Sequence, residues 1–90
     1  MEEAVAKIHE IAKKSENVFF LCDHAKGQAK KRKASSMQIF DVLKHGKGVD
    51  GPKLDRYGDW RIKLKHYTCG RIVQVVVALN VNSLTVVTVI

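Results

Sequence analysis

Residues 72–90 contain no charged side chain, and this stretch constrains the fold more than any other part of the chain. It is long enough to span a bilayer, but Asn80, Asn82 and Ser83 lie in its middle and favour a turn there. The runs on either side are rich in β-branched residues, which favour strands. We therefore predict two buried strands, at 71–79 and 84–90, joined by a turn at 80–83.

The strand at 71–79 is predicted to lie in the centre of a sheet, because both of its faces are largely apolar. A third strand is predicted at 59–67, separated from it by a tight turn at 68–70. Because short loops join antiparallel neighbours, the three strands should form an antiparallel meander.

The strand at 59–67 has one apolar and one basic face, since side chains alternate along a strand. The apolar face is formed by Trp60, Ile62, Leu64 and His66, and the basic face by Arg61, Lys63, Lys65 and Tyr67. Residues on one face lie about 7 Å apart, close to the phosphate repeat of a nucleic acid, so the basic face suits a polyanion. A solvated outer face, with lysines that serve solubility, explains the same pattern.

The first half of the chain supplies the helices. Apolar residues at helical spacing predict a helix at 2–14. Five consecutive apolar residues predict a buried strand at 18–22, and a charged helix is predicted at 24–33. Ser35 and Gln38 form a capping-box pattern for a further helix that ends at His45 and Gly46, so the last two helices form a hairpin. Residues 47–58, rich in glycine, form a connection with at most one edge strand.

These elements predict an α+β fold in which N-terminal helices pack on a three- to four-stranded antiparallel sheet. Ninety residues with 46% hydrophobic content suffice for one domain, 1–90, in which 1–17 form an N-terminal helix and 18–90 the α+β core. An exposed edge of this valine-rich sheet could support a homodimer.

The charge is concentrated in the middle of the chain. The net charge is +7, and residues 24–71 hold all the Lys and Arg beyond the first helix. This balance predicts attraction to nucleic acid, anionic lipid or an acidic protein. The sequence lacks a secretion signal at its start and paired Cys-x-x-Cys spacing, so we expect a cytoplasmic protein with two reduced thiols, Cys22 and Cys69, and with neither a metal nor a cofactor.

The basic residues, with one histidine, have the chemistry for metal-independent RNA cleavage. His24 is the candidate acid or base, Arg32 and Arg61 can clamp a phosphate, and Lys63 can stabilise the charge of the transition state. The candidate RNA-binding residues are Lys30, Lys31, Lys65 and Tyr67. Three of these residues also have a structural explanation: His24 follows Asp23 at a helix start, and Lys30 and Lys31 suit a solvated helix face. His45 is expected to be a helix-end histidine and His66 a partly buried structural residue.

The sequence resembles small bacterial domains of unknown function that are related to BrnT and RelE toxins. The resemblance is carried by His24-Ala25, Arg32, Ser35, Gly46, Trp60-Arg61, the valine-rich strand and the terminal Val-Val-Thr-Val, over about 18–90. It implies helices packed on an antiparallel sheet and an antitoxin, acidic or DNA-binding, that blocks the basic groove. By position, His24, Arg32 and Arg61 match the polar signature of the family, and Thr88 matches its terminal threonine. Gln28 departs from it, since an arginine is usual there.

Two functions follow as expectations. The first is a toxin-like endoribonuclease that acts on RNA, free or on the ribosome. The second is a non-catalytic module of the same fold that binds nucleic acid or an acidic protein.

Overall fold

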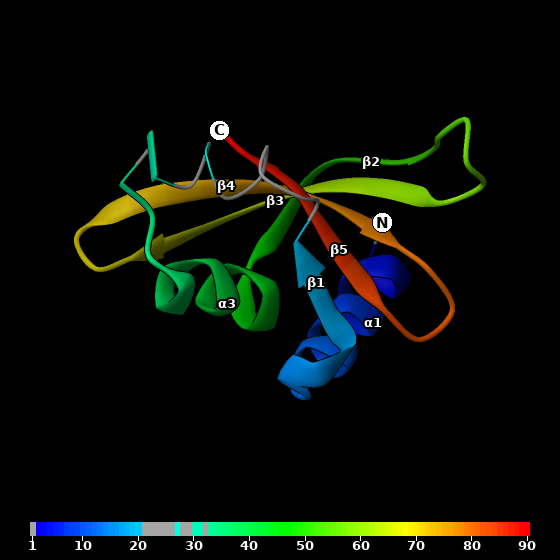
Figure 1. Ribbon diagram of the computed structural model, residues 1–90, viewed down its shortest axis with the longest axis horizontal. Coiled ribbons are helices and arrows are strands. Elements are labelled where there is room, and N and C mark those ends of the chain that lie inside the picture. Colours follow the sequence, from blue (N-terminus) through cyan, green and yellow to red (C-terminus); the bar gives the residue numbers. More distant parts are fainter. Residues whose placement is uncertain (1, 21–26, 28–29, 32) are drawn as a thin grey trace.

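The computed structural model describes residues 2–20, 27, 30–31 and 33–90. The described part contains two α-helices, a short 3-10 helix and a five-stranded sheet, in an α+β arrangement (Figure 1). The helices are α1 (Glu2–Ala12), η1 (Ser15–Asn17) and α3 (Ser36–His45). The strands are β1 (Val18–Phe20), β2 (Lys47–Leu54), β3 (Trp60–Thr68), β4 (Arg71–Leu79) and β5 (Leu84–Val89).

The sheet has the strand order β1-β5-β4-β3-β2, so the predicted central strand, β4, is in the middle. The predicted antiparallel meander of β3, β4 and β5 is confirmed. The prediction of three to four antiparallel strands is wrong, because β1 pairs in parallel with β5 and β2 adds a fifth strand. The apolar run made β1 recognisable as a strand, but nothing local in its described residues specifies a partner that far along the chain. The predicted burial on both faces is wrong, because Val18 is buried whereas Phe19, on the other face, is 54% exposed.

Both described helices lie on one side of the sheet (Figure 1). The core between them and the sheet contains Ile8 of α1, Leu43 of α3 and Leu64 of β3, each fully buried. The other sheet face carries the alternate side chains of β3, as the sequence pattern predicts. The predicted helix at 24–33 lies mostly outside the described residues, although Gly27, Lys30 and Lys31 are helical.

The ends of α3 are formed as the sequence predicts. The hydroxyl of Ser35 accepts a hydrogen bond from the backbone N–H of Gln38, and the Gln38 side chain accepts one from the Ser35 N–H. At the other end, the Gly46 N–H donates to the carbonyl of Val42. A side chain at position 46 would meet that same carbonyl oxygen, so only glycine fits there without a shift. His9 Nε2 donates to the Gly46 carbonyl at 2.8 Å, which fixes α1 against the end of α3.

Trp60 is an exception to the predicted alternation on β3. Ile62 and Leu64 are buried under the helices as expected, but Trp60 is 47% exposed. It is the first residue of β3, next to the β2–β3 connection, and that hairpin extends beyond both helices (Figure 1). Alternation selects a face of the sheet, but burial also requires a helix above that end of the strand.

The two outer strands are poor templates for further strand pairing. Three residues of β1 are described, Val18–Phe20, and β2 contains Pro52, the positive-φ residue Gly51 and two register shifts against β3. Short length, proline and irregular register are features that natural proteins use to protect sheet edges.

Candidate nucleic-acid interface

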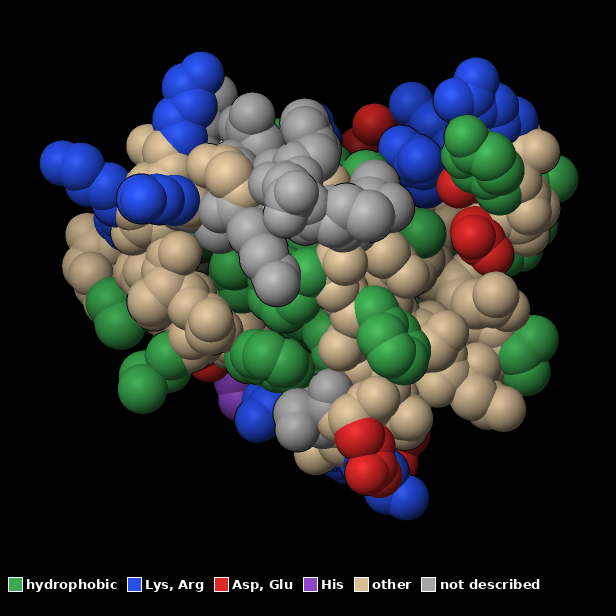
Figure 2. All heavy atoms as spheres, in the orientation of Figure 1, with side chains coloured by type: hydrophobic (Ala, Val, Ile, Leu, Met, Phe, Trp, Pro, Cys, Tyr) green, Lys and Arg blue, Asp and Glu red, His purple; other side chains and the backbone are tan. Residues whose placement is uncertain are grey.

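A basic face runs along β2 and β3 on the side of the sheet away from the helices. β3 contributes Arg61, Lys63, Lys65 and Tyr67, and the register places Lys53 of β2 opposite Arg61 and Lys47 opposite Lys65. We call these six side chains the basic face. Space-filling Figure 2 shows Lys and Arg gathered over the tip of the β2–β3 hairpin, with acidic side chains beside them.

Arg61 is held by the turn that precedes its strand. Its Nε lies 3.1 Å from Oδ2 of Asp55, and the Asp55 carboxylate also accepts the backbone N–H groups of Tyr57 and Asp59. Burial acts to raise the pKa of Asp55, but these backbone hydrogen bonds and the Arg61 guanidinium outweigh it, so the pKa lies below its ordinary value. Arg61 therefore stabilises the turn, and its charge is already partly neutralised.

We expect Asp55→Asn to destabilise the protein at pH 7 and to have less effect in acid. A carboxyl group whose pKa is lowered by folding contributes stability above its unfolded pKa of about 4, and that contribution is lost as the pH falls below it. Urea unfolding at pH 7 and near pH 2.5 measures the difference between wild type and variant at each pH. Asp59→Asn is the matched control, because only backbone groups of Asp59 take part in the turn. A wild-type–variant difference that does not shrink in acid would contradict this role of the carboxylate.

Lys63 and Lys53 also lie near a carboxylate, that of Asp50. Asp50 lies opposite Lys63 in the register and forms an ion pair with Lys53 at 3.2 Å. The hydrogen bond and charge of Lys53, the Gly51 N–H and, more weakly, the charge of Lys63 hold the pKa of Asp50 below its ordinary value. These two lysines are therefore partly neutralised within the sheet.

Lys47 and Lys65 are different, because they face each other across β2 and β3 without a counter-charge. Both are exposed, and in the part of the chain that the structure describes neither forms an ion pair. Like charges directly opposite each other on a sheet are destabilising, and a bound anion would remove that cost. Tyr67 lies two residues beyond Lys65 and is 68% exposed.

The other predicted site residues either are separate from the Lys47–Lys65 pair or lie outside the residues that the structure describes. His24 and Arg32, together with Cys22 and Gln28, lie outside the described residues. Lys30 and Lys31 are exposed, and Figure 2 shows a second group of basic side chains over the segment that precedes α3.

A histidine cluster on the helix-facing side of β3, across the strand from the basic face, was not predicted. His66 is partly buried, as expected, and its Nε2 lies 3.5 Å from Oδ2 of Asp41 on α3. The ring of His45 lies 6.0 Å from that of His66, with 39° between the ring planes. Asp41 and His45 are four residues apart and share one helix face, and His66 is on the helix-facing side of β3. These spacings were the available signal, but the sequence does not show that α3 crosses β3 at this point.

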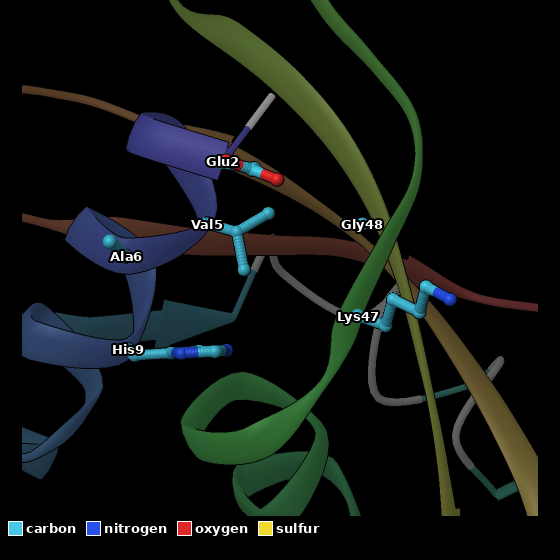
Figure 3. Close-up of a pocket in the computed structure, with 6 residues that line it drawn as sticks. All are labelled: Glu2, Val5, Ala6, His9, Lys47 and Gly48. Carbon is cyan, nitrogen blue, oxygen red and sulfur yellow. The ribbon is translucent and has the colours of Figure 1, made fainter.

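An apolar pocket of about 480 Å³ lies between α1 and the start of β2. Figure 3 shows that Val5 and His9 point from α1 toward β2, whereas the Lys47 side chain extends away from α1. Lys47 therefore contributes its stem to this pocket and leaves its ammonium group free for the basic face.

Neither a metal centre nor a membrane span is evident in the described residues. Over 2–20, 27, 30–31 and 33–90, no three His, Cys, Asp or Glu side chains are grouped so that they could hold a metal ion. No helix in these ranges combines the length and apolar character needed to cross a bilayer.

Comparison with known proteins identifies one family. Residues 21–90 match the sequence model described as "Domain of unknown function (DUF4258)". No curated protein and no solved structure matches significantly. The match begins after α1 and β1 and includes the basic face and the histidine cluster.

Proposed function

The chain belongs to the DUF4258 family of domains of unknown function, and from the geometry of its sheet we propose that it binds RNA and cleaves it without a metal ion. The observation that carries the proposal is the Lys47–Lys65 pair, two exposed lysines that are direct partners in the β2–β3 register and form no ion pair in the described structure. A phosphate between them would form two charge-assisted contacts and relieve their repulsion.

Single-stranded RNA fits this surface better than a small anion does. Lys63 and Lys65 lie on the same face of β3, so their spacing of about 7 Å suits successive phosphates. Tyr67 extends the row with an exposed aromatic ring, on which an unpaired base can stack. Single-stranded RNA offers both phosphates and unstacked bases.

The resemblance to BrnT and RelE toxins supports cleavage as the outcome of binding. On this proposal the domain is a toxin-like endoribonuclease that acts on free or ribosome-bound RNA, and an acidic or DNA-binding antitoxin neutralises it by covering the basic face. His24, Arg32, Arg61 and Lys63 remain the residues that the resemblance and the sequence nominate for catalysis. Expression without the antitoxin should arrest growth.

A non-catalytic module is the second candidate, and one observation favours it. Arg61 and Lys63, two of the four nominated catalytic residues, are already near carboxylates of Asp55 and Asp50. Cations neutralised in this way can position RNA but have less charge available for a transition state. Such a module would bind RNA, or an acidic protein, through the same face and leave RNA intact.

The test is binding of a fluorescent single-stranded RNA at several salt concentrations. We expect Lys47→Gln/Lys65→Gln to weaken binding about tenfold and to reduce the salt dependence, by roughly 0.7 in log–log slope for each lost phosphate contact. Lys7→Gln/Lys13→Gln, on an exposed residue of α1 and on one in the turn that follows it, removes the same charge from the helix side of the sheet and should change affinity much less. Equal losses in the two double variants would show that only net charge matters and would contradict a site on the basic face.

Cleavage is then measured on the same RNA in EDTA, with and without ribosomes. Fragments that appear with wild type in EDTA support the endoribonuclease. Intact RNA under all conditions, together with salt-sensitive binding, supports the non-catalytic module.

A further inference from the structure

We infer that His45 and His66 are the acid–base pair that receives the scissile phosphodiester, with Asp41 as a positioning residue. This inference rests on the proposed RNA-cleaving function and assigns its proton transfers to a site different from His24. All three residues belong to the described structure, at the end of α3 and the end of β3.

Asp41 faces one nitrogen of His66. Its Oδ2 lies 3.5 Å from Nε2 of His66, and we therefore assign Nδ1, the nitrogen that does not face the carboxylate, as the base. A carboxylate that orients an imidazole in this way also stabilises the imidazolium that forms when the base takes up a proton. The side chains of His66 and Asp41 are 30% and 35% exposed, so a ligand can reach them from solvent.

His45 supplies the second imidazole at a suitable separation. The ring centroids are 6.0 Å apart, and a catalytic nitrogen acts over a heavy-atom distance of about 2.6–3.2 Å. Two imidazoles at this distance can therefore contact the attacking and leaving oxygens of one phosphate group, which lie on opposite sides of phosphorus.

Each histidine lines a surface hollow of its own; the described lining of the His66 hollow is net basic, and that of the His45 hollow holds one lysine and one aspartate. His66 lines one of about 250 Å³ with Lys47, Lys65 and Tyr67, and His45 and Asp41 line another of about 400 Å³ with Lys44. The charged and titratable groups that line the two hollows with the histidines are Asp41, Lys44, Lys47, Lys65, Tyr67 and Cys69. Among the described residues of these linings are three lysines and one carboxylate, Asp41, and this net charge favours a phosphate.

The basic face and His66 belong to opposite sides of β3, and they meet in one hollow near the end of that strand. Lys47 and Lys65 belong both to the basic face and to the hollow that His66 lines. The β2–β3 pairing ends at Lys47 and Lys65, so the last residues of β3 have no β2 partner. RNA held by these lysines would bring a phosphate to this end of β3.

The reaction balances without any further reagent. Nδ1 of neutral His66 removes the proton of the ribose 2′-OH, and the 2′-oxygen forms a new bond to phosphorus. The bond from phosphorus to the 5′-oxygen breaks, and that oxygen takes a proton from the His45 imidazolium. The products are a 2′,3′-cyclic phosphate and a 5′-hydroxyl, with the two histidines in exchanged protonation states. Lys65 and Lys47 stabilise the negative charge that develops on the phosphorus oxygens.

The inference is tested with single variants of the whole chain in EDTA. We expect His66→Ala and His45→Ala each to slow cleavage by about 10²–10⁴-fold, with RNA affinity changed less than threefold, on the order expected for removal of one general acid or base. The double variant should be about as slow as the slower single variant, because the two groups act as a unit. Asp41→Asn should slow cleavage less than either histidine variant does. It should also shift the acidic and basic limbs of the pH–rate profile, which simple loss of packing would not do.

His24→Ala and Val81→Ala are the comparison variants. Val81 is an exposed residue of the β4–β5 turn, which follows Leu79, whereas His66 pairs with Val73 near the other end of β4, so replacement of Val81 should leave cleavage unchanged. Cleavage that persists in His66→Ala and His45→Ala but disappears in His24→Ala would overturn the inference while the proposed function stands. Thermal unfolding of each variant separates loss of chemistry from loss of fold.

A binding readout decides the inference if wild type leaves RNA intact. Uridine 3′-monophosphate is titrated into the protein, and the imidazole signals of His45 and His66 are followed by NMR. Joint shifts of both signals that are lost in Lys47→Gln/Lys65→Gln would place a phosphate at the pair even though the nuclease function had failed. Unshifted signals would overturn the inference.

Discussion

Leu64→Ala is expected to lower the free energy of unfolding by about 3 kcal/mol, which corresponds to a fall in melting temperature of about 12–24 °C for a domain of this size. Leu64 is fully buried on the helix-facing side of β3, and α3 packs over this strand. The methyl groups that alanine lacks would leave a cavity between the helix layer and the sheet, and the rigid strands around it can collapse only partly. Urea denaturation measures the loss.

Lys65→Ala is the matched control for this prediction. Lys65 is the next residue of the same strand, but its side chain is exposed on the basic face. A surface substitution of this kind should change the free energy of unfolding by less than about 0.5 kcal/mol, and removing one member of the Lys47–Lys65 pair could even stabilise the protein. Similar losses in Leu64→Ala and Lys65→Ala would contradict the assignment of the two faces of β3.

The local parts of the fold could be predicted because their signals are local. The Ser35–Gln38 capping box, the alternation of Ile62 with Lys63 and the two apolar faces of β4 each depend on residues within a few positions of one another. The pairing of β1 with β5 was missed because Val18 and Leu84 are far apart in sequence, and a three-residue apolar strand fits many partners. Trp60 was misplaced because its burial depends on the reach of a distant helix.

The same distinction separates the parts of the candidate site. Exposure of Lys65 and Tyr67 followed from alternation along one strand. The neutralisation of Arg61 depends on Asp55, six residues earlier, through a turn whose geometry the sequence did not define. The Asp41–His66 contact joins a helix to a strand, so it requires the crossing of α3 over β3, which only the folded structure supplies. We therefore expect site residues that share one strand to be identifiable from the sequence. Site residues that come together from two different elements are expected to be missed.

The core of this chain extends beyond the residues that define its family. The family match begins at residue 21, yet Ile8 and Ala12 of α1 and Val18 of β1 are all buried in the same core as the sheet. His9 adds a hydrogen bond to Gly46, immediately after the helix that carries Asp41 and His45. In this chain α1 therefore supports both the core and the end of α3.

Removal of residues 1–17 is accordingly expected to abolish cooperative folding. The remaining 18–90 would expose the apolar surface that Ile8, Ala12 and the partly buried Ala4, Val5 and Ile11 now cover, a loss comparable with the whole stability of a small domain, about 5–15 kcal/mol. Circular dichroism during urea denaturation, and the dispersion of NMR amide signals, report whether a cooperative fold persists.

Point variants of α1 test the same contact without shortening the chain. Ile8→Ala should cost about 2–5 kcal/mol, because it deletes buried methyl groups from a fully buried position, whereas Lys7→Ala on the exposed side of the helix should cost little. Ile8→Ala should also weaken the hold of His9 on Gly46 and so disturb the NMR signals of His45 more than Lys7→Ala does. A truncated chain that unfolds cooperatively, with wild-type stability, would show that α1 is dispensable and that the residues matched by the family form a complete folding unit.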